Sequence, residues 1–547
     1  GERNPKWLQD DYVKFIRFGQ WRIEQSGQGI LAFISNNGYL DNPTFRGMRQ
    51  SLLASFSEIY VLNLHGNAKK KETTPEGGKD DNVFDIMQGV AISFFIRQPG
   101  KMGTDPAKVY YADLWGTRIN KYAYLLEQET AVTDWIQVNP QSSFYLFVPQ
   151  SQDLVSEYKN AWNVREIFPT NSTGIKTHRD HFALDFDVSA LYKRIENFKN
   201  VEALTDGEVA ELYSLQDTRD WKISLKRKAL AQDVNWNHYF TKCLYRPFDT
   251  RAYYNSDHIV ELPRHEIMRH LYLKNLALGV GRQGLAVGND WDIVTVTNKP
   301  IDTNFFRRGG VQVLLLYLYP TEGIQKQTSL FDASPWPPDI ANGGRVPNLA
   351  PAFVEDMAQR LGLTFQPFST AAASPDAFTP EDIFHYIYAI FHSPTYRARY
   401  AEFLKIDFPR VPLTADVALF RRLCALGQEL VALHLLESPA VQQSITRYPS
   451  AGDNTIAKGY PKYTPPTASE AGRVYINKAQ YFSGIAPELW EFQIGGYQVL
   501  DKWLKDRRGR TLSYEELTHY QQTAVALQQT MTLMEQIDTA VPEWPIV

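Results

Sequence analysis

The most informative stretch of the sequence is Gly29 to Leu40, which reads Gly-Ile-Leu-Ala-Phe-Ile-Ser-Asn-Asn-Gly-Tyr-Leu. A companion stretch, Asn82 to Arg97, reads Asn-Val-Phe-Asp-Ile-Met-Gln-Gly-Val-Ala-Ile-Ser-Phe-Phe-Ile-Arg. In each, a short apolar run is bounded by glycine or polar residues, which is typical of a strand buried on both faces of an α/β sheet. We therefore predict that both stretches form central strands.

The neighbouring residues supply the other parts of an α/β unit. Apolar residues recur at helical spacing from Phe45 to Phe56, and Ile59 to Leu64 reads as another strand. Ahead of the first strand, Asp11 to Glu24 carries an apolar helical stripe that should pack on the sheet. The predicted order is helix, strand, helix, strand, loop, strand.

Length and composition limit the class of protein. The 547 residues are too many for one core and suggest about three domains at ~100–200 residues each. Mean hydropathy is −0.36, as in a soluble globular chain, and the sequence contains no run of about 18 apolar residues that would predict a membrane span. The two cysteines, Cys243 and Cys424, rule out a disulfide framework and a cysteine-based zinc site, which fits a reducing cytoplasm.

Charge and aromatic content bear on nucleic-acid binding. A net charge of −4 and a pI near 6.3 argue against a uniformly basic nucleic-acid coat, so any DNA contact must use local patches. The 30 Tyr, 30 Phe and 12 Trp suit base stacking and equally suit large cores.

Composition shifts along the chain predict four parts. Residues 1–105 form a partial Rossmann-like α/β sheet, and residues 106–320 mix short strands and helices in an α+β region. Residues 321–380 are a linker-rich connection with Pro, Gly, Ser and Gln. Residues 381–547 are mainly helical, and Gly495-Gly496 should let another backbone segment approach closely.

The opening segment resembles a known family, the gamma-class adenine-specific DNA methyltransferases. Ser35-Asn36-Asn37-Gly38-Tyr39-Leu40, followed by Phe45-Arg46-x-x-Arg49 and Leu52-Leu53, is similar to the strand and helix downstream of that family's catalytic motif. Asn82-Val83-Phe84, just before the strand Val90 to Ile96, matches the place of an aromatic residue that stacks on the flipped adenine. Within the class, the chain looks like the Type ISP restriction-modification enzymes and their single-chain Type IIG relatives.

The resemblance extends nearly to the C-terminus. Tyr245 to Arg251, Arg264-His265-Glu266, and Ile494 to Leu504 look like segments of the family's recognition region. The family's glycine-rich S-adenosylmethionine loop and its Asn/Asp-Pro-Pro-Tyr/Phe tetrapeptide, both upstream in relatives, do not occur in this sequence. We therefore expect the C-terminal part of a larger enzyme, comprising the end of a methyltransferase sheet and a target-recognition region.

The resemblance implies a function and partners. The complete enzyme would transfer a methyl group from S-adenosylmethionine to the exocyclic amino group of a flipped adenine, with Phe84 stacked on the ring. The expected partners are double-stranded DNA with a short specific site and upstream methyltransferase, helicase-like and nuclease domains. This chain holds no catalytic residue of its own and should not methylate alone. The alternative is a stand-alone DNA-binding specificity module, and a third, weaker alternative is a remnant of an RNA or protein methyltransferase.

Other polar residues are candidates for DNA contact. Lysine and arginine suit phosphates, and Arg or Gln can make paired bonds to a purine edge. For the loop Lys69 to Lys71 and for the basic stretch Lys505 to Arg510, a solvated surface is the simpler interpretation. For Arg246 and Arg251, the structural alternative is an ion pair with Asp249. The candidates are Asn37, Tyr39, Lys69, Lys70, Lys71, Lys176, Thr177, His178, Arg179, Arg246, Arg251, Arg282, Gln283, Lys458 and Lys462.

Two further patterns in the sequence do not indicate cofactor or metal sites. The run Gly279 to Gly284 matches a dinucleotide fingerprint literally, but the residues after it do not read as the helix that the fingerprint requires. His178, Asp180 and His181 are too close in sequence to converge on a metal without a special turn. We predict no metal site in this chain.

Overall fold

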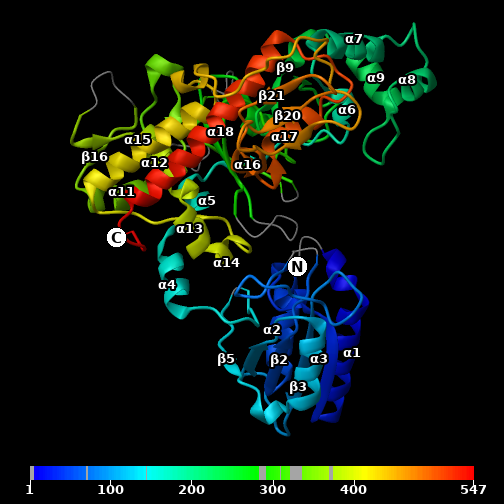
Figure 1. Ribbon diagram of the computed structural model, residues 1–547, viewed down its shortest axis with the longest axis vertical. Helices are drawn as coiled ribbons and strands as arrows, with labels where there is room; N and C mark the ends of the chain where they lie inside the picture. The colour runs from blue at the N-terminus through cyan, green and yellow to red at the C-terminus, as the bar shows by residue number, and fades with distance from the viewer. Residues whose placement is uncertain are drawn as a thin grey trace. The chain divides into compact units, whose positions relative to one another are not determined.

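The computed structural model describes residues 5–68, 72–142, 144–282, 291–307, 310–320, 335–368 and 374–546. The chain divides into two compact units, Gly1–Glu157 (unit 1) and Tyr158–Val547 (unit 2). Figure 1 labels several of the helices and strands of each unit.

Unit 1 is built on a five-stranded mixed sheet. Its strand order is β1-β3-β2-β4-β5, and β3 runs antiparallel to both β1 and β2. β2 and β4 are parallel, so β1, β2 and β4 all point the same way, with β3 inserted between the first two. The strands are β1 (Gly29–Asn36), β2 (Glu58–Asn63), β3 (Val90–Arg97), β4 (Lys108–Asp113) and β5 (Ile136–Val138).

Helices cover the sheet unequally. α1 (Asp11–Ser26) and α2 (Arg46–Ser55) supply Ile16 and Leu52 to a core that also contains Phe95 of β3. α3 (Arg118–Glu127) belongs to a smaller cluster on β2, β3 and β4. The helices and strands predicted between residues 11 and 97 are confirmed to within a few residues.

The prediction that both quoted stretches are central strands holds for β3 only. Among the described residues, β1 pairs with β3 alone and lies at the sheet edge. Ile30 and Ile34 point to one face of β1 and are 65% and 49% exposed. A continuous apolar run predicts burial, but whether neighbouring strands are present to provide it is not encoded in the run itself.

The expected domain boundary near residue 105 is wrong. β4 and β5 hydrogen-bond into the same sheet as β1 to β3, and the first compact unit extends to Glu157. β4 continues the sheet because its register with β2 places Val109 beside the buried Ile59.

Unit 2 contains two larger antiparallel sheets and several two- and three-stranded ones. Strand order is β12-β11-β13-β7 in one and β8-β10-β9 in the other. The first comprises β7 (Asn171–Thr173), β11 (Ala277–Val280), β12 (Val294–Thr297) and β13 (Gln312–Leu315); the second comprises β8 (Leu184–Asp185), β9 (Phe240–Arg246) and β10 (Asp249–Tyr254). The small strands are β6 (Trp162–Asn163), β14 (Tyr317–Leu318), β15 (Val346–Pro347), β16 (Thr364–Phe365), β17 (Ala377–Phe378), β18 (Arg410–Val411), β19 (Lys462–Thr464), β20 (Arg473–Tyr475), β21 (Tyr481–Ser483), β22 (Gln493–Ile494) and β23 (Tyr497–Gln498).

Three long helices dominate the C-terminal part, as predicted. They are α12 (Pro380–His392), α15 (Val417–His434) and α18 (Tyr514–Ala540), which lie side by side (Figure 1). His434 of α15 and Thr530 of α18 are joined by a 2.9 Å hydrogen bond. The other helices are α4 (Gln152–Asn160), α5 (Val164–Ile167), α6 (Asp180–Ala183), α7 (Val188–Lys199), α8 (Asp206–Leu212), α9 (Ile223–Gln232), α10 (His265–Met268), α11 (Pro351–Leu361), α13 (Pro394–Arg399), α14 (Ala401–Leu404), α16 (Pro487–Glu491) and α17 (Val499–Lys505).

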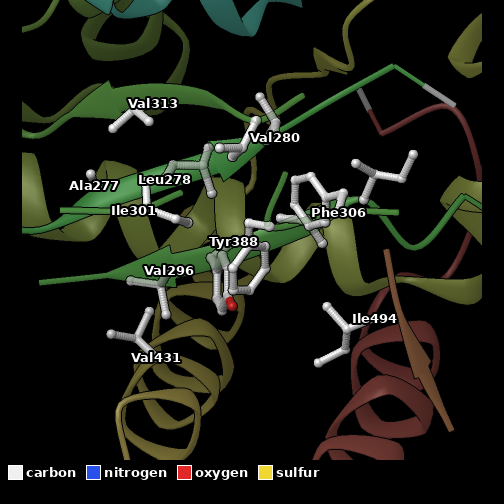
Figure 2. Close-up of a cluster of buried hydrophobic side chains, with 14 of the residues drawn as sticks. Ala277, Leu278, Val280, Val296, Ile301, Phe306, Val313, Tyr388, Val431 and Ile494 are labelled. Atoms are coloured by element: carbon white, nitrogen blue, oxygen red, sulfur yellow. The ribbon is translucent and has the colours of Figure 1, made fainter. Parts of the chain in front are cut away.

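One hydrophobic core runs through unit 2. Figure 2 shows Leu278 and Val296 of β11 and β12 near Tyr388 of α12 and Val431 of α15, and all four belong to one buried cluster. The apolar sheet is therefore covered by helices from the C-terminal part. Residues 158–320 and 381–547, which the sequence assigns to separate parts, bury this common core, whereas residues 106–157 belong to unit 1.

Candidate nucleic-acid interface

The first candidate surface is the edge of the unit 1 sheet where three parallel strands end. β1, β2 and β4 deliver Asn37, His65 and Asp113 to this edge. β3 runs the other way, so the loop that precedes Val90 reaches the same edge opposite Asn36. In open α/β sheets, the carboxyl ends of the strands are where ligands bind.

Polar side chains at this edge bond to one another. Asn37 donates to Asn63 Oδ1 at 3.0 Å, and His65 Nε2 lies 2.6 Å from Asp113 Oδ1. The His65 ring stacks on Trp115, with centroids 3.3 Å apart and planes 14° from parallel. These contacts stiffen the edge and tie the side chain of Asn37 to β2.

Asn37 and Tyr39 were predicted to contact DNA, and both are buried instead. The Tyr39 hydroxyl lies 2.5 Å from Ser93 Oγ, and burial raises the pKa of Tyr39 above its ordinary value. Both side chains therefore serve the interior of unit 1, which corrects the prediction.

Phe84 lies on the loop ahead of β3, as the sequence position predicts. Its side chain is 45% exposed, and the neighbouring Ile86 and Met87 are also exposed. The backbone is ordered locally because Phe84 N donates to Asn82 Oδ1 at 2.9 Å, and Asn82 Nδ2 donates to the carbonyls of Gly66 and Gln88. An exposed ring thus stands on a hydrogen-bonded loop at the carboxyl edge of the sheet.

In unit 2, the loop from Lys176 to Arg179 divides between surface and interior. Thr177 is buried and bonds to Asp180, while the buried Arg179 guanidinium lies 3.9 Å above the Trp221 ring. Burial lowers the pKa of Arg179. The prediction of DNA contact is therefore wrong for Thr177 and Arg179. Lys176 is half-buried and His178 is exposed beside Glu261.

Arg251 forms the expected ion pair with Asp249, and Arg246 pairs with a different carboxylate. Arg251 bonds to Asp249 at 2.7 Å, whereas Arg246 pairs with Asp302 at 2.8 Å. Arg507 also bonds to Asp249, and although burial opposes the effect, the two guanidinium groups hold the pKa of Asp249 below its ordinary value. Burial raises the pKa of Asp302 to about 6, against the opposing charge of Arg246. These arginines bind carboxylates within unit 2.

A second candidate surface gathers around Tyr460. Lys458 and Lys462 are exposed, and the Lys462 ammonium lies 5.1 Å from the Tyr460 ring. Arg508, also exposed, donates to the Tyr460 carbonyl. Within the described ranges, none of these three cations pairs with a carboxylate, so their charge faces solvent. We call Lys458, Lys462 and Arg508 the Tyr460 cluster.

Arg508 was not among the predicted contacts. Arg508 belongs to the basic stretch Lys505 to Arg510, for which the sequence favours a solvated surface. The fold brings Arg508 beside Tyr460, which lies 48 residues earlier in the chain. Arg282 is exposed, with its guanidinium 5.7 Å from the Phe408 ring. The candidates Lys69, Lys70, Lys71 and Gln283 lie outside the described residues.

The fold is shared with restriction-modification enzymes of known structure. The ATP-dependent Type ISP enzyme LlaBIII bound to DNA matches with a TM-score of 0.66 at 20% identity, covering 100% of this chain and 34% of that one. The DrdV–DNA complex, solved by cryo-electron microscopy, matches with a TM-score of 0.65 at 21% identity, covering 98% and 52%. A nuclease-deletion mutant of the Type ISP enzyme LlaGI with a DNA substrate mimic matches with a TM-score of 0.62 at 22% identity, covering 99% and 48%.

The family assignment comes from sequence. Residues 166–536 match the Type ISP C-terminal specificity domain, which is more than half of the chain. The chain belongs to this family. It spans between a third and about half of the length of the three structures above. No curated protein sequence matches it.

Two further features are absent from the part of the chain that the structure describes. No helix there is long and apolar enough to cross a membrane. The same residues contain no group of three or more His, Cys, Asp or Glu side chains arranged to hold a metal ion.

Proposed function

We propose that this chain recognises a short DNA sequence and presents a target adenine within a restriction-modification enzyme that methylates the adenine exocyclic amino group. Phe84 stacks on the flipped base at the carboxyl edge of the unit 1 sheet. Unit 2 holds the duplex and reads its sequence. Membership of the Type ISP specificity family and the DNA-bound relatives of the same fold support this proposal.

The observation that carries the proposal is the Phe84 loop. Aromatic side chains of this size are usually buried, and Phe84 instead exposes its ring on a loop whose backbone is hydrogen-bonded. Enzymes that modify a base extrude it from the helix and hold it against flat side chains. An exposed ring at the strand ends of an α/β sheet suits this task.

The edge of β1 supports the link to a methyltransferase. Ile30, Ala32 and Ile34 lie on one face of a strand whose outer edge is unpaired among the described residues. An apolar face beside an open strand edge favours continuation of the sheet by another strand. We assign that strand to the methyltransferase segment that precedes this region in the resembling family.

S-adenosylmethionine is the methyl donor of the proposed enzyme. This sequence has neither the family's glycine-rich loop nor its catalytic tetrapeptide. We therefore expect the main binding loop for S-adenosylmethionine in the upstream segment of the complete enzyme, and no step of methyl transfer is assigned to this chain.

In unit 2, phosphate contacts should position the duplex and a few base contacts should specify it. The candidates of unit 2 that remain after the buried ones are excluded are the Tyr460 cluster, His178 and Arg282, which are exposed, and Lys176, which is half-buried. The rival function is a stand-alone DNA-binding module with no methyl transfer.

The test uses this chain and an enzyme that contains it. The chain is incubated with a random duplex library, and bound duplexes are recovered and sequenced. The enzyme is incubated with unmethylated plasmid and labelled S-adenosylmethionine, and methylated positions are mapped. We expect one short motif in both experiments, with the label on an adenine. Enrichment of no motif would contradict recognition, and a motif without methylation would favour the rival.

A further inference from the structure

α3 lies along the Phe84 loop, and its side chains hold four consecutive peptide carbonyls. Arg118 Nε donates to Asn82 O at 2.7 Å, and Arg118 Nη2 donates to Phe84 O at 3.0 Å. Lys121 donates to Asp81 O at 2.7 Å, and the Tyr122 hydroxyl donates to Val83 O at 2.5 Å. We propose that Arg118 is a positioning residue that fixes the Phe84 ring for base stacking, an inference that rests on the proposed function.

Lys121 anchors the start of the loop. Its buried ammonium group donates to Asp80 at 2.6 Å, to Leu64 O at 2.7 Å and to Asp81 O, which accounts for all three of its N–H donors. The other Asp80 oxygen accepts from Gly66 N at 2.6 Å. Removal of either charge would leave its partner buried and unpaired, so these residues support the fold and are poor probes of positioning.

Arg118 differs from the buried Lys121 because its side chain lies at the surface. Its side chain is 38% exposed and reaches the carbonyls on both sides of Val83, and it also pairs with the exposed Asp85 at 2.8 Å. A guanidinium presents several N–H groups in one plane, which is what two neighbouring carbonyls and a carboxylate require. A lysine carries a compact ammonium group and cannot reproduce this planar set of bonds.

Fixing the backbone matters because Phe84 is 45% exposed, so packing covers only part of its ring. A mobile loop would have to become ordered each time a base arrives, at a cost in conformational entropy. With residues 81 to 84 bonded to α3, the loop is ordered before the base is extruded. Such preorganisation raises the rate of the step that uses the ring and leaves the affinity for DNA largely unchanged.

The experiment compares Arg118→Ala, Arg118→Lys, Phe84→Ala and the Phe84→Ala/Arg118→Ala double variant in the complete enzyme. Methyl transfer into unmethylated plasmid is measured in single turnover, with DNA affinity and thermal unfolding measured in parallel. Arg17→Ala is the matched control, because Arg17 is an exposed arginine of unit 1 whose ion-pair partner among the described residues is Glu24, at 3.4 Å.

We expect Arg118→Ala to slow methyl transfer about tenfold or more, with DNA affinity within about twofold of the wild type. Arg118→Lys should not restore the rate. In the Phe84→Ala background, Arg118→Ala should have almost no further effect, because both changes remove the same positioned ring. Arg17→Ala should behave as the wild type.

The possible results distinguish a failure of the Arg118 inference from a failure of the proposed stacking by Phe84. Equal effects of Arg118→Ala with and without Phe84 would show that Arg118 acts elsewhere and would overturn the inference. Slow methyl transfer in Phe84→Ala together with a wild-type rate in Arg118→Ala would also overturn the inference, but this result would agree with stacking by Phe84. A normal rate in Phe84→Ala would refute stacking itself. If Arg118→Ala does not fold, Arg118→Lys, which keeps the charge and loses the planar set of bonds, takes its place in the same comparison with and without Phe84.

Discussion

At the scale of single residues, the two candidate surfaces depend on side chains that the interior does not use. Phe84 exposes a ring, and the Tyr460 cluster exposes three cations. The sequence does not distinguish these cations from Arg179, Arg246 and Arg251, which are bonded to other residues of unit 2. Sequence position was enough to place Phe84 on a loop at the sheet edge, because loops ahead of central strands lie there. It was insufficient for the arginines, because their carboxylate and aromatic partners are supplied by tertiary contacts up to 255 residues away.

Phe84 gives the first prediction. Phe84→Ala should lower single-turnover methyl transfer by roughly 10- to 100-fold, because stacking of one base on an aromatic ring is worth ~1–3 kcal/mol. DNA affinity, measured by fluorescence anisotropy, should change much less. Phe84→Trp keeps a flat ring and should retain most of the rate. Loss of DNA binding in step with methylation would assign Phe84 to the duplex and not to the flipped base.

The Tyr460 cluster gives the second prediction. Removing one phosphate contact should lower the slope of log affinity against log salt concentration by about 0.9. Lys462→Ala and Arg508→Ala should each do so without altering the preferred sequence. Lys405, an exposed lysine that pairs with Glu402, is the control, and Lys405→Ala should leave the slope unchanged. An unaltered slope in the cluster variants would place the DNA elsewhere.

At the scale of elements, helices were predictable because their signals are local. α18 begins at a capping box in which Ser513 Oγ accepts from Glu516 N at 3.2 Å and Glu516 Oε2 accepts from Ser513 N at 3.1 Å. Strand position was less predictable: β1 has the apolar run of a central strand and lies at the edge. Sheet order depends on which distant strands pair, and no local pattern records it.

The cap of α18 gives the third prediction. Ser513→Ala should destabilise unit 2 by about 1 kcal/mol, because one N–H group at the start of the helix loses its acceptor. Tyr514→Ala, at the adjacent residue whose side chain is 83% exposed, should change stability by less than about 0.5 kcal/mol. Urea unfolding of the two variants beside the wild type measures the difference, and equal midpoints would argue against a role for the cap.

At the scale of the whole molecule, composition suggested about three domains and the structure has two compact units. The linker-like composition of residues 321–380 reads as a boundary, yet the segments on both sides of it share a core. Composition reports only local polarity, while a domain is defined by which apolar faces meet. Tyr388 and Leu278, 110 positions apart in the sequence, contribute to one cluster (Figure 2).

The fourth prediction concerns pH. Burial lowers the pKa of His270 to about 4 and of His434 to about 3, so the folded protein keeps both neutral while the unfolded chain takes up protons below about pH 6.5. The unfolded state then binds more protons, and stability must fall as the pH falls from about 6.5 toward 4. Asp302 partly offsets this, because its raised pKa lets the folded state take up a proton over the upper part of that range.

Urea unfolding at pH 7.5 and pH 5.5 tests whether the free energy of unfolding falls as the pH falls. We expect lower stability at pH 5.5, and a smaller difference in His434→Gln, which removes one titrating group and retains polar atoms toward Tyr388 and Thr530. Greater stability at pH 5.5 would mean that the carboxyl group outweighs the histidines.

The carboxylate of Asp249 is satisfied in part by Arg507, a residue that lies 258 positions later. A ribosome adding about 5–20 residues per second needs roughly 13–50 s to make that span. During that interval the nascent polypeptide carries a half-finished core with an incompletely paired charge. Production of this protein in a foreign host should therefore depend on chaperone supply and growth temperature more strongly than its length alone would suggest.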